Sequence, residues 1–275
     1  MAKSSTTVAT REKVPPKNDV AVSAELEHAA LFAEYAGAGM ETVGAADVSI
    51  PRFKLLQDLS PEVNKRKAEY IEGAEPGQIL NTATKAVSAS IEVLPVVYRR
   101  HNIEWMPDRG GFVADHGDDE TPVKHARKDE KNNLIMPNGN LIVPTATWYV
   151  IDLITGLQGI IAMSRTQMNP SKDWMNMATS EKLTAPNGNG RYTPPLFYRG
   201  YSLSSRVRDK GENSWFVWNA TRGPTILELA QKLNQPDLMA QAIKFSELVT
   251  SGEIKVNADT FSDDVNVRES DDDTI

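Results

Sequence analysis

Aromatic and arginine side chains alternate in two stretches of the sequence that also have the composition of β-strands. Bases of single-stranded nucleic acid stack on aromatic rings while guanidinium groups hold the phosphates, so this mixture is typical of a single-strand-binding surface. Between residues 191 and 222, six basic residues stand against two acidic ones. The residues that we predict to bind nucleic acid are Tyr98, Arg99, Arg100, Trp105, Tyr198, Arg199, Tyr201, Arg206, Arg208, Trp215 and Trp218.

Each of these rings also has a purely structural interpretation, because large aromatic side chains are common in protein cores. Successive residues of a strand point to opposite faces, which separates Trp215 from Trp218 and Arg99 from Arg100. Only one face of a strand can form a binding platform. The pattern therefore leaves open which of the aromatic residues stack on bases.

Acidic residues and histidines gather between residues 115 and 125, where they could serve a different chemistry. Carboxylate and imidazole groups bind divalent cations, so a metal-dependent nuclease is one alternative, with candidate residues Asp115, His116, Asp118, Asp119 and Glu120. The stretch is polar and poorly periodic, which favours a solvated loop instead. The sequence has no cysteine and none of the serine-hydrolase, zinc-protease or P-loop motifs. We therefore expect a protein that is not an enzyme and has no catalytic residues, metal or cofactor.

The elements that must position the aromatic and basic residues are mostly strands. Segments rich in β-branched and aromatic residues predict strands at 91–100, 147–154, 159–163, 196–204 and 214–220. Pro95 indicates an edge strand or a bulge, and the polar residues 209–213 indicate a hairpin turn. Helical spacing predicts peripheral helices near 170–178, 225–233 and 236–251. Because a small antiparallel sheet hides its edges best by closing, we expect a mainly β fold, an OB-like antiparallel barrel with flanking helices.

Charge and composition divide the chain into three parts. We expect residues 1–48 to be a mostly disordered arm with a short helix near 23–35. Residues 49–252 are predicted to form the OB-like nucleic-acid-binding domain, with a polar insertion near 108–144. Residues 253–275 contain eight acidic and two basic residues, which accounts for −6 of the net charge of −7. We expect a solvated acidic tail there, attached to an almost neutral body.

Signals for membranes or export are absent from the sequence. No apolar run approaches the roughly 20 residues needed to cross a bilayer, and the N-terminal residues have no apolar stretch of the signal-peptide kind. The lack of cysteine agrees with a reducing compartment. We therefore expect a protein of the host-cell cytoplasm with no membrane partner.

Three local phrases carry a resemblance to a known group of proteins. They are Ile50-Pro51-Arg52-Phe53-Lys54-Leu55-Leu56-Gln57, Gly73-Ala74-Glu75-Pro76-Gly77 and Arg99-Arg100-His101-Asn102-Ile103-Glu104-Trp105. With the β-rich centre and the acidic C-terminus, the chain resembles the single-stranded DNA-binding proteins of tailed bacteriophages. The resemblance implies an OB-type barrel that coats single strands during phage replication or recombination.

In such proteins the acidic tail recruits replication enzymes and competes with DNA for the binding groove. The residues of this chain that match the tail are Asp271, Asp272, Asp273 and Ile275. Many members of the family end in phenylalanine, so isoleucine at the terminus departs from their pattern.

The leading hypothesis is a single-stranded DNA-binding protein without sequence preference, whose tail binds phage or host replication proteins. One alternative is a phage protein that binds or inhibits a host protein and does not bind DNA. The other is the metal-dependent nuclease described above. The sequence leaves open whether the protein prefers DNA or RNA and whether it forms a homo-oligomer.

Overall fold

The computed structural model describes residues 31–32, 34–35, 38–42, 50–107, 110–254 and 261. The chain divides into two compact units, Met1–Val48 and Ser49–Ile275. In the first unit, Leu31, Phe32 and Glu34 are helical and Tyr35 lies in a turn, while the other residues of the helix predicted near 23–35 lie outside the described residues. The elements below all belong to the second unit.

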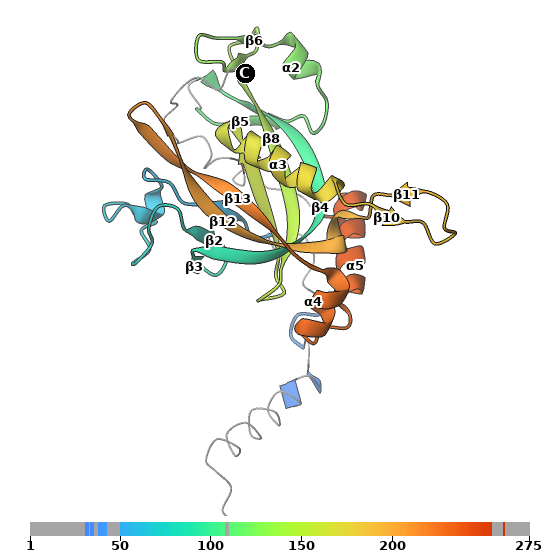
Figure 1. The fold of residues 1–275 in the computed structure, drawn as a ribbon. Helices are drawn as coiled ribbons and strands as arrows, with labels where there is room; N and C mark the ends of the chain where they lie inside the picture. The colour runs from blue at the N-terminus through green and yellow to red at the C-terminus, as the bar shows by residue number, and fades with distance from the viewer. Residues whose placement is uncertain are drawn as a thin grey trace, which may run out of the picture. The chain divides into compact units, whose positions relative to one another are not determined.

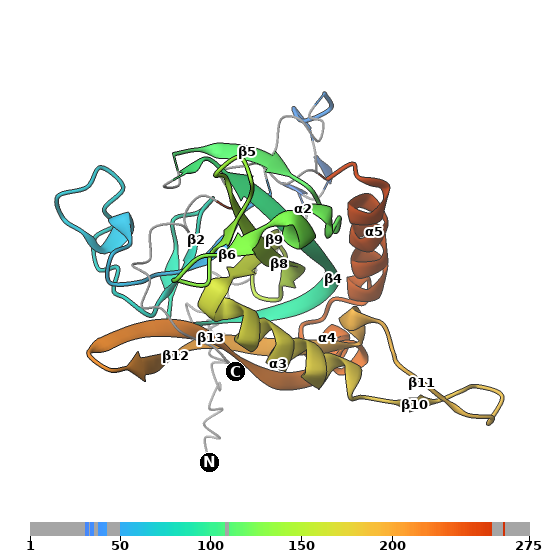
Figure 2. The same cartoon turned by 90° about the horizontal axis from the view of Figure 1, so that it is seen from above.

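The second unit is mainly β and is built on a curled antiparallel sheet of eight strands, which forms a half-barrel (Figures 1 and 2). The order is β13-β12-β4-β8-β7-β6, with β5 also paired to β4 and β9 to β8. The strands are β4 (Ser90–Trp105), β5 (Phe112–Asp115), β6 (Arg127–Lys128), β7 (Leu134–Ile135), β8 (Leu141–Asp152), β9 (Gln158–Ser164), β12 (Arg199–Lys210) and β13 (Asn213–Thr225). The prediction of a mainly β, barrel-like fold with peripheral helices is confirmed.

Strand β4 is the long central strand of this sheet. It pairs with β12 on one side and with β8 on the other, so the prediction of an edge strand at Pro95 is wrong. The register against β8 shifts between Pro95 and Val97 instead. A bulge accommodates the missing N–H of proline within a paired strand, which was the other reading of this residue.

A second, smaller sheet extends the half-barrel. It contains β1 (Phe53–Leu55), β2 (Ile79–Asn81) and β3 (Val87–Ser88), in that order. A parallel bridge joins Arg52 to Ile160 of β9, so the small sheet continues the large one at its β9 edge.

Two glutamine side chains occupy the outer edge of β13. The Gln57 amide accepts from the Phe216 N–H at 3.0 Å and donates to the Phe216 carbonyl at 2.9 Å. Gln167 donates to the same carbonyl at 2.9 Å and accepts from the Trp218 N–H at 3.0 Å. Side-chain amides thus satisfy edge groups that would otherwise need a neighbouring strand.

Both faces of the sheet are covered. On the inner face, strand residues such as Trp148, Tyr201 and Leu203 form a core with Trp174 of the helix α3 (Met168–Thr179). On the outer face, residues such as Leu94 and Tyr149 pack against α4 (Ile226–Lys232) and α5 (Leu238–Ser251). A strand with two buried faces reads as a continuous apolar run, and β8 is an example.

Helix ends follow the sequence signals. Thr225 caps α4 in a capping box with Glu228, and Gly252 ends α5 in the left-handed region at φ 78°. The remaining short elements are η1 (Pro61–Val63), α2 (Thr121–His125), η3 (Arg165–Gln167), η4 (Leu196–Tyr198), β10 (Leu183–Thr184) and β11 (Arg191–Tyr192). In the described part of the chain, the helices are too short or too polar to span a membrane.

The two predicted hairpins are present as β8–β9 and β12–β13. The second one differs at both ends from the prediction. Residues 196–198 form the 3-10 helix η4, so the strand begins only at Arg199. Pairing continues to Lys210 opposite Asn213, which leaves a two-residue turn with Gly211 at φ 60°.

Candidate nucleic-acid interface

Six of the residues that we predicted to bind nucleic acid are aromatic, and four of these six are buried. Trp105, Tyr201, Trp215 and Trp218 are exposed by only 4%, 2%, 9% and 3%. A ring enclosed in this way has no face open to a base. In this structure these four residues belong to the core.

An aromatic cluster fills the inside of the half-barrel and shows why those rings are enclosed. Trp148 stacks on Trp174 with ring centroids 4.0 Å apart and planes 15° apart. Tyr98 meets the edge of Trp148 at 5.1 Å, and Trp174 meets Tyr201 at 5.7 Å. The Trp148 indole N–H donates to the Ser171 hydroxyl at 2.9 Å. These rings pack against one another. Tyr98 and Tyr201 were both predicted to bind nucleic acid, and of these two only Tyr98 is partly exposed.

Arg199 is occupied by contacts within the protein. Its Nε and Nη2 donate to the two Glu181 carboxylate oxygens at 2.8 and 2.7 Å, and its Nη1 donates to the Gly223 carbonyl at 2.6 Å. These hydrogen bonds from Arg199 lower the pKa of Glu181 below its usual value. The guanidinium also lies 5.8 Å from the ring centre of the half-buried Tyr198. Arg199 and Tyr198 therefore secure the start of β12.

The tip of the β12–β13 hairpin carries exposed basic residues. β12 pairs with β4 only from Tyr201 to Ser204, so the residues after Ser204 extend beyond β4 as a two-stranded arm (Figure 1). Arg206 and Lys210 are exposed there and Arg208 is half-buried. These three residues are two apart along the strand, so they share one face of the arm.

Arg99 and Arg100 are also exposed, but they lie elsewhere. They pair with Thr147 and Ala146 of β8, on opposite faces, and Arg100 is on the face of Tyr98. The pairing of β12 with β4 ends at Ser204 and Ser90. From this pair, Arg206 and Arg208 lie in one direction along the strands, and Arg99 and Arg100 lie in the opposite direction. The structure thus forms two basic surfaces where the sequence suggested one groove.

The candidate nuclease residues do not converge. His101 Nδ1 and Asp115 are 2.7 Å apart, and His116 Nε2 and Glu104 are also 2.7 Å apart, so two histidine–carboxylate pairs link β4 to β5 and the residue that follows it. Asp119 accepts from the Thr121 N–H at 2.8 Å. Within the residues that the structure describes, no group of three or more acidic or histidine residues could hold a metal.

The two carboxylates of these pairs have lowered pKa values for different reasons. For Glu104, the hydrogen bond from the Asn140 side chain is the main cause, with His116 contributing. For Asp115, burial acts to raise the pKa, but hydrogen bonds from His101 and the Gly117 N–H outweigh it. Both groups therefore stabilise the join between β4 and β5 as carboxylates.

Phe261 lies beyond the end of α5, in the part of the sequence predicted to be a solvated tail. It is only 4% exposed and packs with Ile103, Trp105 and Leu141. Its ring centre is 5.5 Å from that of His101. The packed body therefore includes a residue after Gly252. Asp271, Asp272, Asp273 and Ile275 lie outside the described residues.

The predicted elements do not include the short β10–β11 hairpin. Its turn has a clear sequence signal, Pro186-Asn187-Gly188-Asn189-Gly190, but only two residue pairs flank it. Strands this short have no readable alternation, which is why composition alone does not reveal them.

A family model described as Pam3 phage gp34-like protein matches residues 22–255, which is most of the chain. The chain belongs to this gp34-like family. It is therefore a bacteriophage protein, as the resemblance implied. Neither the curated proteins nor the solved structures contain a match. The gp34-like match covers the elements from β1 to α5 and ends near the start of the acidic segment.

Proposed function

We propose that this gp34-like protein binds single-stranded DNA without sequence preference and acts, without catalysis, in phage DNA replication or recombination. The observation that carries the proposal is the β12–β13 arm, with Arg206, Arg208 and Lys210 on one face beyond the edge of β4. The curled antiparallel sheet that supports the arm is also the kind of scaffold on which single-strand-binding proteins are built.

The spacing of the arm residues suits a flexible polyanion. Alternate residues of a strand are about 7 Å apart, so three cations in a row can each meet a different phosphate. Lys and Arg that neutralise phosphates release counterions, which provides affinity without reading the bases. The Arg206 guanidinium lies 3.8 Å from the Asp173 carboxylate, and both side chains are exposed. A contact of this kind contributes little and can exchange for a phosphate.

Arg99 and Arg100 support a second contact surface on β4, with the partly exposed Tyr98 between Arg100 and the core. The acidic residues after Phe261 support the proposed role of the tail. Asp271, Asp272, Asp273 and Ile275 would recruit replication proteins, and the tail's negative charge would compete with DNA for the basic surfaces.

The test is fluorescence anisotropy of labelled oligo-dT with the full-length protein at low and moderate salt. Binding should weaken steeply as salt rises, because each neutralised phosphate contributes about 0.7 to the slope of log affinity against log salt. Duplex DNA of equal length is the matched probe and should bind more weakly. No binding of oligo-dT at micromolar protein and low salt would overturn the proposal.

A further inference from the structure

The β10–β11 hairpin projects from the body as a separate arm between α3 and η4 (Figures 1 and 2). Leu183 pairs with Tyr192 and Thr184 with Arg191. Gly188 and Gly190 in the turn have φ of 74° and 86°, a conformation that glycine adopts without strain. This arm has no part in either core face, so its sequence is not constrained by packing.

The surface of the arm is basic and carries an exposed ring. Lys182 and Arg191 are exposed, and Tyr192 is 44% exposed. The segment from Lys182 to Thr193 contains no acidic residue. The preceding acid, Glu181, is held by Arg199 through two hydrogen bonds. The arm thus offers two cations and an aromatic ring, with Arg191 and Tyr192 on opposite faces of the thin hairpin, and it has no carboxylate of its own to neutralise the cations.

The base of the arm is firmly attached to the body. Arg222 donates to the Met177 carbonyl at 2.7 Å and to the Ser180 hydroxyl at 2.9 Å, at the end of α3 from which the arm leaves. A guanidinium at a helix C-terminus also interacts favourably with the helix dipole. The chain returns through the buried Pro194. The arm is therefore held in position at its base.

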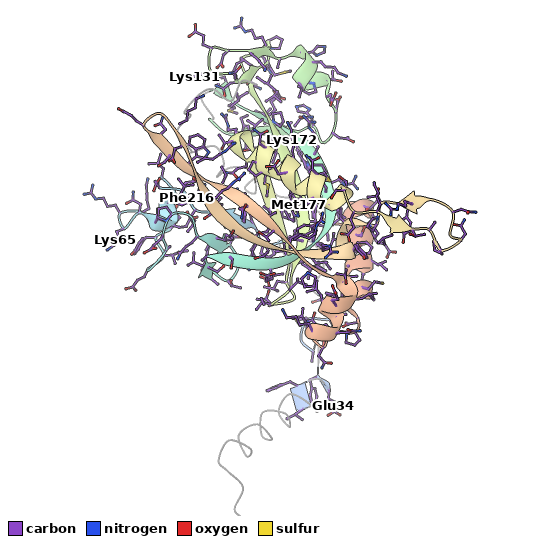
Figure 3. All side chains as sticks on the ribbon, in the orientation of Figure 1. Glu34, Lys65, Lys131, Lys172, Met177 and Phe216 are labelled. Carbon is purple, nitrogen blue, oxygen red and sulfur yellow. The ribbon has the colours of Figure 1, made fainter. Side chains whose placement is uncertain are left out.

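Helix α3 lies between this arm and the β12–β13 arm in both views of the fold (Figures 1 and 2). Arg206 approaches Asp173 at the middle of the helix, and Arg222 binds its C-terminal end. Twelve helical residues span about 18 Å, which a few nucleotides of single strand can cross. Lys172, labelled in Figure 3, is exposed on α3 along this path.

We infer that the β10–β11 hairpin is a second single-strand-binding arm, in which Tyr192 stacks on a base while Lys182 and Arg191 hold phosphates. A strand bound at Arg206 and Lys210 then passes along α3 to reach it. The inference rests on the proposed function and adds residues and a path to it. An apolar protein partner fits this arm less well, because most of its other exposed residues are cationic or polar.

The experiment compares full-length variants for binding to an oligo-dT of about 16 nucleotides, near the upper site size of one OB fold. Tyr192→Ala should weaken binding about fivefold to a hundredfold, the range for loss of one base–aromatic stack. Tyr192→Phe keeps the ring and should bind within about twofold of the wild type. Lys182→Ala with Arg191→Ala should reduce the salt slope by about 1.4, because two phosphate contacts are lost.

The charge-matched control is Lys232→Ala with Lys244→Ala, which removes two exposed cations from α4 and α5. It should leave both affinity and salt slope close to the wild type. If the wild type binds oligo-dT but the variants of the β10–β11 hairpin bind equally well, the inference that this hairpin binds DNA is wrong and the proposed function stands. If the wild type itself does not bind, the proposed function fails instead.

Discussion

The inside of the half-barrel and the surface of its two hairpin arms are built from the same kinds of residues but differ in what those residues contact. Inside, Trp148 stacks on Trp174, Trp174 meets Tyr201 edge-on, and all three are almost fully buried. On the arms, Arg206 and Tyr192 face solvent. The same residue types therefore form a core inside the half-barrel and a candidate binding surface on the arms. Substitutions should separate the two roles.

The largest loss of stability is expected for a substitution in the core of the half-barrel. Trp174→Ala removes the ring that stacks on Trp148 at 4.0 Å and leaves a cavity in the half-barrel. The free energy of unfolding should fall by about 3–5 kcal/mol, measured by urea denaturation. Oligo-dT affinity of the protein that remains folded should not change. A loss below about 1 kcal/mol would contradict the role of this ring as core.

Lys54 and Glu62 form a buried ion pair, unlike the exposed charges of the arms. Lys54 Nζ lies 2.9 and 3.0 Å from the two carboxylate oxygens of Glu62, and both side chains are buried. Glu62→Ala should lower the free energy of unfolding by about 3 kcal/mol, because the ammonium loses this carboxylate without regaining water. The double change Lys54→Met with Glu62→Leu should cost much less. If the single and double variants are equally unstable, packing and not charge explains the loss.

The pH dependence of stability tests the role of the two carboxylates, Glu104 and Asp115, that join β4 to β5. The pKa values of Glu104 and Asp115 are lower in the folded protein than in the unfolded chain. Their contribution to the free energy of unfolding is therefore fully present above the unfolded-state pKa values near 4, and it is lost as the pH falls through the folded-state pKa values. Glu104→Gln should lower the free energy of unfolding at pH 7 by about 1.5 kcal/mol. It should also flatten the decline between pH 5 and about pH 3 seen by urea denaturation. An unchanged acid profile would exclude Glu104 from this role.

The smallest effect on stability is expected on the β12–β13 arm. Arg206→Ala with Lys210→Ala should change the free energy of unfolding by no more than about 0.5 kcal/mol. The same variant should bind oligo-dT more weakly and reduce the salt slope by about 1.4. Lys232→Ala with Lys244→Ala again serves as the control. Equal binding by both variants would remove the arm from the proposed interface.

Local patterns were sufficient to predict much of the fold. The two hairpins follow from β-branched runs around turns, and α4 follows from the threonine cap with Glu228 three residues on. The central position of β4 was not predictable, because its pairing with β12 joins residues more than a hundred positions apart. Nor was the attachment of Gln57 to Phe216, which are 159 residues apart.

For the candidate site, the sequence predicted the types of residue involved but not which of them are exposed. Alternation shows that Trp215 and Trp218 face opposite ways, but it does not reveal that both faces of β13 are covered. Trp218 joins the core that contains Trp174 of α3, a helix predicted without its docking position. Arg199 likewise fits a phosphate contact in sequence, and only the fold brings Glu181 to it. Burial of a strand face depends on what packs on it from elsewhere in the chain.

The glutamines on the edge of β13 have a consequence for self-association. A strand edge with unpaired N–H and C=O groups recruits strands from other copies and seeds aggregates. At Phe216 both backbone groups are already bonded, by Gln57 and Gln167, and a ring atom of Phe216 would lie within 2.5 Å of a Cβ at Gly77. An incoming strand would have to displace all of these groups before pairing there. Copies of the protein can therefore be crowded together without their sheets joining at this point.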